Sequence, residues 1–170
     1  GEYALDECLK SLEETSASME TLVVINGSRC IAHRGQWEIQ IKKQGQCRAV
    51  NAAVATTDSK WVFVTNYDMV YGHGWFEDLV IGLSEDILCV SPQLVEPRPG
   101  ASTFIVQPFG GASGDFDKKK WLDFYFDHSG GGFRTGFNLP FLIRRQLWDL
   151  ISGYDINYDP WGSNSDSDLE

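Results

Sequence analysis

The alternation of strand-like and helix-like stretches over the first 90 residues is the feature that most constrains the fold. Three short apolar runs have the length of buried strands, and a fourth stretch alternates apolar with polar side chains like a half-exposed strand. The strand-like stretches are residues 21–25, 37–41, 60–65 and 87–90, and the helix-like ones are residues 3–15, 48–55 and 75–83. This order predicts an α/β fold with a mostly parallel sheet flanked by helices, and fully buried strands at 21–25 and 60–65.

The second half of the chain has a less regular pattern. Prolines and glycines are frequent between residues 92 and 114, which predicts a loop with one strand near residues 103–106. The later stretches are an aromatic segment at 121–126, a glycine-rich turn at 130–132, a strand at 141–143 and a short helix at 145–151. A length of 170 residues matches a single domain.

Charge, hydropathy and cysteine spacing disfavour several classes of protein. The chain has 24 acidic and 14 basic residues, a formal net charge of -10, which disfavours binding to a nucleic-acid backbone. Its apolar runs are far shorter than a membrane-spanning helix. The cysteines Cys8, Cys30, Cys47 and Cys89 form no CxxC pair, which is typical of buried thiols in a reducing compartment. We therefore expect a protein of the cytoplasm or of the cytoplasmic face of a membrane.

The strongest local signal for chemistry is the segment Asn66-Tyr67-Asp68, which directly follows the apolar run at 60–65. In open α/β sheets, ligands bind beyond the carboxyl ends of the strands. A carboxylate such as Asp68 can ligate a divalent cation there, and the cation can neutralise a diphosphate. Taken alone, an Asp after a strand is more often a turn or a helix cap, so that interpretation stays open.

The acidic tail is a second candidate. Asp166 and Asp168 are two residues apart and would not face the same way on a helix, so one of them can point into a site and act as a general base. A solvated acidic helix start is the alternative. HExxH, GxSxG and P-loop motifs are absent from the sequence, which removes the usual support for zinc-protease, serine-hydrolase and P-loop activities.

In their order and spacing, these signals resemble family 2 glycosyltransferases with the GT-A fold, over nearly the whole chain. In the first half, residues 5–12 and 22–28 are similar to the family's opening helix, second strand and turn, and residues 47–54 to the helix before its metal motif. In the second half, the similar segments are the strand and DxD-like motif at 60–68, the strand, arginine, helix and Gly-Tyr-Asp at 141–155, and the Trp-Gly and Asp-x-Asp-Leu ending at 161–169.

The resemblance implies an inverting glycosyltransferase that moves a sugar from a UDP- or GDP-linked donor to a hydroxyl of a carbohydrate or other acceptor. It implies a magnesium or manganese cofactor ligated by Asp68, and Asp166 as the catalytic base. One GT-A-like catalytic domain would span residues 1–170, with the nucleotide-sugar-binding half at 1–90 and the acceptor-binding half at 91–170.

Further residues are assigned to binding by the same resemblance. The donor-binding positions are Asn26, Arg48, Asn66 and Asp68, and the acceptor-binding positions are Trp161 and Asn138. Trp161 would stack on a sugar ring, and a hinge or core tryptophan is the alternative. Acceptor choice is expected to lie in residues 108–138.

The sequence departs from the family pattern at several positions. Ile25 stands where an aspartate usually contacts the base, Asn66 replaces the first aspartate of DxD, and Ser165 replaces the glutamate before the catalytic aspartate. The family also opens with a buried strand and continues past the Asp-Leu helix, so we expect this chain to be a fragment of a longer enzyme that lacks a central strand. These departures keep open the alternative of a non-catalytic sugar- or nucleotide-binding module on the same fold. A nucleotidyltransferase is a further alternative, since that class uses a related sheet and metal, but its usual basic Gly-rich loop near the N-terminus is absent here.

Overall fold

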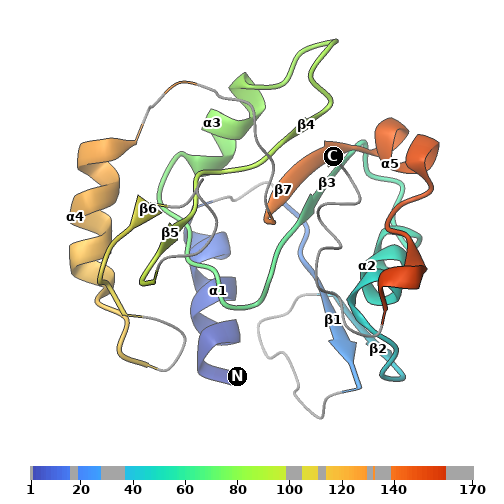
Figure 1. The fold of residues 1–170 in the computed structure, drawn as a ribbon, viewed down its shortest axis with the longest axis horizontal. Coiled ribbons are helices and arrows are strands. Elements are labelled where there is room, and N and C mark those ends of the chain that lie inside the picture. Colours follow the sequence, from blue (N-terminus) through green and yellow to red (C-terminus); the bar gives the residue numbers. More distant parts are fainter. Residues whose placement is uncertain are drawn as a thin grey trace.

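The computed structural model describes residues 2–15, 19–27, 37–98, 105–110, 114–129, 132 and 139–159 (Figure 1). Its helices are α1 (Glu2–Thr15), α2 (Gln46–Val54), α3 (Trp75–Ile81), α4 (Lys118–His128) and α5 (Arg145–Ile151), with the 3-10 turn η1 (Ile156–Tyr158). Its strands are β1 (Leu22–Asn26), β2 (Trp37–Ile41), β3 (Trp61–Val64), β4 (Cys89–Val90), β5 (Val95–Glu96), β6 (Ile105–Val106) and β7 (Phe141–Arg144). All four predicted helices are therefore confirmed, with ends shifted by one or two residues.

The described strands form three small sheets, and a mostly parallel central sheet is not seen among them. β1 pairs with β2 in parallel, and β5 pairs with β6 in parallel. In the three-stranded sheet of order β3-β7-β4, β7 is antiparallel to both neighbours. The parallel sheet was predicted from strands of the first 90 residues, which follow one another in sequence. In the structure, β7 lies between β3 and β4, although it begins more than fifty residues after β4 ends.

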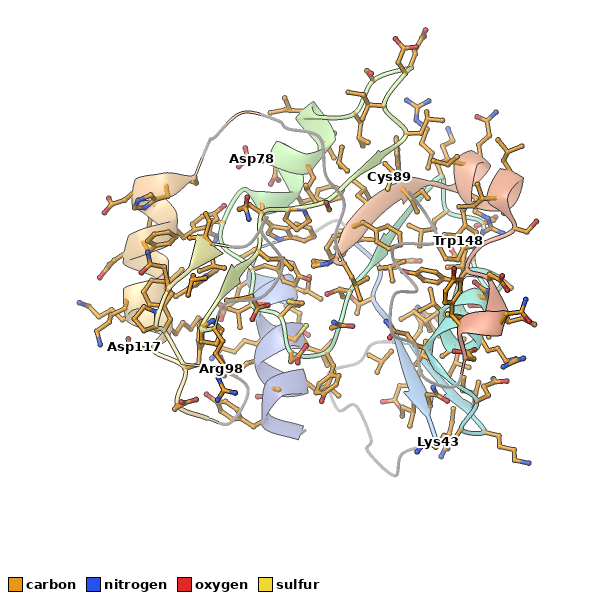
Figure 2. The ribbon with its side chains drawn as sticks, viewed as in Figure 1. Lys43, Asp78, Cys89, Arg98, Asp117 and Trp148 are labelled. Carbon is orange, nitrogen blue, oxygen red and sulfur yellow. The ribbon has the colours of Figure 1, made fainter. Side chains whose placement is uncertain are left out.

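The core lies on both faces of the three-stranded sheet because side chains alternate along each strand. On one face, Phe141 and Ile143 of β7 pack with Val64 of β3 against α2 and α5. On the other face, Leu142 packs with residues of α1, α3 and β4. Figure 2 shows Trp148 of α5 on the side of the molecule where α2 lies, in agreement with its place in the first cluster. Helices therefore cover both faces of this sheet.

The prediction of full burial for the strands at 21–25 and 60–65 is wrong. In β1 only Ile25 is buried, in β3 only Val64 is, and the other residues of both strands are half-buried. β1 has β2 as its one strand neighbour and β3 has β7, among the strands described. An apolar run indicates that a strand prefers burial, but it does not indicate how many other strands and helices will pack against it. Among the described strands, β1 and β4 belong to different sheets. The expected absence of a central strand that would join such sheets stays a prediction.

Three described elements of the second half were not predicted, namely α4, β5 and the 3-10 turn η1, and the strand β4 is shorter than expected. The aromatic segment lies in α4, whose start is capped by Asp117, with the Asp117 side chain accepting a hydrogen bond from the Lys120 N–H at 3.1 Å. β5 lies in the stretch predicted as loop, and β4 covers only the second half of the expected strand at 87–90. Within the described ranges, no helix is long and apolar enough to span a membrane.

Candidate functional site

Asn26, the last residue of β1, holds the loop that leads into α2. Its side-chain Nδ2 donates to the Gly45 carbonyl at 2.9 Å, and its Oδ1 accepts from the Gln44 N–H at 3.0 Å. These two bonds fix the side chain in one orientation. With respect to the described residues, a second N–H and a second lone pair of the amide remain for a ligand. The role of Asn26 in donor binding stays a prediction, while its structural role is plain from these contacts.

Arg48 lies in the first turn of α2, where a carboxylate from the far end of the described chain meets it. The N-cap position, Gly45, offers no side chain, and Asp159 takes over that task. The Asp159 carboxylate accepts from the Cys47 N–H at 3.0 Å and the Arg48 N–H at 2.9 Å. It also pairs with Arg48 Nη1 at 3.5 Å. A negative charge at a helix N-terminus is stabilising, and this one is shielded from water because the Asp159 side chain has 0% exposure.

Gly45 is needed at this junction for two reasons. Its φ of +102° lies in the region that favours glycine, and a Cβ at this position would come 2.2 Å from Oδ1 of Asp159. The approach of Asp159 to α2 therefore depends on a missing side chain at residue 45. The sequence alone did not identify Asp159, because its partners lie more than a hundred residues earlier and no local pattern connects them.

Asn66 and Asp68 follow β3, as predicted, on a well-anchored backbone. The Asn66 carbonyl accepts from Thr65 Oγ1 at 3.0 Å and from Cys8 Sγ of α1 at 3.6 Å. Tyr67 and Asp68 are exposed. A fixed backbone with an exposed carboxylate is suited to binding a cation from solvent.

A second carboxylate, Glu96 of β5, lies within the electrostatic influence of Asp68. Partial burial raises the pKa of Glu96, and the negative charge of Asp68 raises it further. Sequence analysis missed Glu96 because it lies in the stretch predicted as loop. A like charge that acts on a partly buried carboxylate favours its protonated form, here that of Glu96.

Whether this region could bind a metal ion depends on the carboxylates of Asp68 and Glu96. In the part of the chain that the structure describes, no group of three or more His, Cys, Asp or Glu side chains is placed to hold a metal ion. Asp68 and Glu96 are therefore too few for a site built from protein ligands alone. Magnesium, however, is commonly held by one or two carboxylates together with substrate phosphates and water. The residues fit a cation that arrives with a diphosphate.

The cysteines near this region are unsuited to nucleophilic chemistry. Burial raises the pKa of Cys8 to about 11, partly offset by a hydrogen bond with the Met69 backbone, and burial raises the pKa of Cys89 to about 12. Thiols with such pKa values remain protonated at neutral pH. Cys8, Cys47 and Cys89 are in the thiol form, with Cys8 and Cys47 buried as predicted, and Cys30 lies outside the described residues.

The described candidate residues form two groups at the carboxyl ends of two strands. One group is Asn26 with Arg48, joined through the loop before α2, and the other is Asn66 with Asp68. In Figure 1, β1 and the chain that leaves β3 run in the same direction, toward the bottom of the view. Three predicted positions lie outside the described residues, namely Asn138, Trp161 and Asp166.

Comparison of the chain with protein-family models, with curated proteins and with solved structures found no match. The resemblance to family 2 glycosyltransferases therefore rests on the motifs quoted above, and it stays a prediction.

Proposed function

We propose that this chain is the catalytic domain of an inverting glycosyltransferase that uses a nucleoside-diphosphate sugar and a divalent cation. The observation that carries the proposal is the position of Asp68. It is exposed, it follows the carboxyl end of a strand on an anchored backbone, and its charge acts on a second carboxylate at Glu96. Ligands of α/β proteins bind beyond the carboxyl ends of strands, where the first βα loops meet.

The cation is assigned to Asp68, with Glu96 as a second candidate carboxylate because the Asp68 charge acts on it. Asp68 would hold the cation together with phosphate oxygens of the donor, and the bound cation would supply positive charge that stabilises the leaving diphosphate. Without such a charge, a donor diphosphate would be repelled by a chain of net charge -10.

The remaining roles belong to protein side chains. Arg48, whose side chain is 41% exposed, would contact the anionic donor. Asp166 takes the proton from the acceptor hydroxyl while that oxygen attacks the anomeric carbon. Attack from the face opposite the leaving diphosphate inverts the configuration at this carbon. Trp161 and Asn138 are assigned to the acceptor.

Titration calorimetry with UDP and GDP, each with and without manganese, tests the proposal. We expect one nucleotide to bind, with an affinity that manganese raises. Asp68→Asn should remove most of the manganese effect. The matched control is Asp78→Asn. Asp78 is also exposed but lies on α3, away from the end of β3, and this variant should leave the manganese effect intact. If neither nucleotide binds under any condition, the proposal is refuted.

A turnover assay tests the catalytic base separately. A panel of UDP- and GDP-sugars is scored for nucleoside diphosphate release in the presence of simple sugar acceptors. Asp166→Asn should abolish release while nucleotide affinity is unchanged, because the carboxylate acts on the acceptor rather than on the donor. Unchanged turnover would remove Asp166 from this role.

A further inference from the structure

The segment that follows α5 is attached to α2 at both ends of its described course. At its start, Tyr154 exchanges two hydrogen bonds with the side-chain amide of Asn51. At its end, the Asp159 carboxylate receives the Cys47 and Arg48 N–H groups and pairs with the Arg48 guanidinium. The segment therefore runs along α2 from Asn51, near the middle of the helix, to its first turn.

Asp159 occupies the place where an anion would otherwise bind to α2. Backbone N–H groups in the first turn of a helix attract phosphates, and here two of them already donate to an internal carboxylate with no exposure to solvent. A donor phosphate that used these groups would have to displace Asp159 and leave its charge without partners, which is costly for a buried group.

The Arg48 guanidinium, in contrast to the N–H groups of the helix, remains partly exposed to solvent. Its contact with Asp159 is a single Nη1 pair at 3.5 Å, and 41% of its side chain remains exposed. A guanidinium has five N–H donors, so this single pair restrains its direction, and among the described residues it leaves donors for a ligand. Asp159 thus restrains Arg48 without consuming its binding capacity.

We infer that Asp159 is a positioning residue of the proposed donor site. It closes the N-terminus of α2 to phosphate and orients Arg48, so that the guanidinium of Arg48, and not the helix, contacts the anionic donor. This inference rests on the proposed function, because the ligand is the nucleotide of that proposal.

A double-mutant cycle measured by calorimetry tests the inference, with UDP and GDP as probes in the presence of manganese. Asp159→Ala and Arg48→Ala should each weaken nucleotide binding about tenfold or more, and the double variant should bind no more weakly than Arg48→Ala alone. This non-additivity arises because Asp159 acts through Arg48, and a merely structural role would not produce it. Asp58→Ala, which alters an exposed aspartate shortly after α2, is the control and should bind like the parent chain.

Asp159→Asn guards against loss of the fold. Its amide oxygen keeps one of the two backbone hydrogen bonds, so this variant should stay folded and show an intermediate affinity. Amide hydrogen exchange at Cys47 and Arg48 reports directly whether the first turn of α2 has opened.

Each outcome decides a different claim. Parent-like affinity in folded Asp159→Ala and Asp159→Asn, or full additivity in the cycle, overturns the positioning role alone. Tighter nucleotide binding in Asp159→Ala overturns it too, because the helix N-terminus would then be a phosphate site that Asp159 blocks. Absence of nucleotide binding by the parent chain refutes the proposed function and the positioning role with it.

Discussion

The side-chain amide of Asn51 is hydrogen-bonded to both backbone polar groups of Tyr154, 103 positions later in the sequence. Asn51 Nδ2 donates to the Tyr154 carbonyl at 2.8 Å, and the Tyr154 N–H donates to Asn51 Oδ1 at 3.0 Å. Gly153 makes this approach possible, since its φ is +71° and a Cβ there would come 2.6 Å from Asn51 Oδ1. A residue near the middle of α2 therefore fixes the path of the chain after α5.

Asn51→Ala should destabilise the fold by about 2 kcal/mol, because two partly buried backbone groups of Tyr154 lose their partner. Chemical denaturation monitored by tryptophan fluorescence measures this loss. Thr56→Ala, which removes an exposed hydrogen bond to the Ala53 carbonyl just beyond the same helix, is the control and should cost less than about 0.5 kcal/mol. Equal costs for the two variants would show that the Asn51 contacts add no stability.

Arg145 closes the other end of α2. Its Nη1 donates to the carbonyls of Val54 and Thr57, and its Nε donates to Asp149. Arg145→Met should cost about 1–2 kcal/mol, because helix-terminal carbonyls lose a charged donor. Asp149→Ala should cost less than about 0.5 kcal/mol, since the Asp149 side chain is 58% exposed and surface ion pairs contribute little. The difference in unfolding midpoint between the two variants checks this order, and a larger loss in Asp149→Ala would contradict it.

Local pattern was enough to predict four of the five described helices, all but α4, and most of the described strands. The apolar positions of α1, including Cys8 and Leu12, recur at helical spacing, and they are indeed its buried face. The segment Asn66–Asp68 was also placed correctly after β3, because a polar cluster after an apolar run marks the end of a strand.

Local sequence patterns did not predict the contacts between segments that are far apart in the chain. The antiparallel entry of β7, the influence of the Asp68 charge on Glu96 and the capping of α2 by Asp159 each involve residues far apart in sequence. No periodicity or motif encodes such pairings, because they depend on the packing of whole elements. Asn26 illustrates the same limit, since its position at the end of β1 was predicted but its bonds to the loop before α2 were not.

Glu96 makes stability depend on pH in a defined direction. Its pKa in the folded state lies above the ordinary value of 4.5, because burial and the charge of Asp68 disfavour the carboxylate. Between these two pKa values the folded state holds a proton that the unfolded state has lost, so stability falls as pH rises through that interval. Glu96→Gln should therefore stabilise the fold at about pH 7 and have little effect at about pH 4.

Urea unfolding at both pH values, with the exposed Glu85→Gln as control, measures this difference. Manganese provides a second readout. A cation shared by Asp68 and Glu96 would raise the melting temperature of the parent chain more than that of Glu96→Gln. A destabilised Glu96→Gln at about pH 7 without metal would contradict the expected sign.

Two glycines at helix starts provide the sharpest test of the Asp159 contact. Gly45 precedes α2 and Gly74 precedes α3, and both have positive φ, +102° and +83°. Gly74→Ala should cost about 1 kcal/mol, the ordinary penalty for an L-residue in this region, because its Cβ meets nothing within 4 Å. Gly45→Ala should cost about 3 kcal/mol or more, since its Cβ also displaces the buried Asp159 carboxylate from the N–H groups of α2. Faster amide exchange at Cys47 and Arg48 in Gly45→Ala would accompany this loss, and equal costs for the two variants would show that Asp159 tolerates displacement.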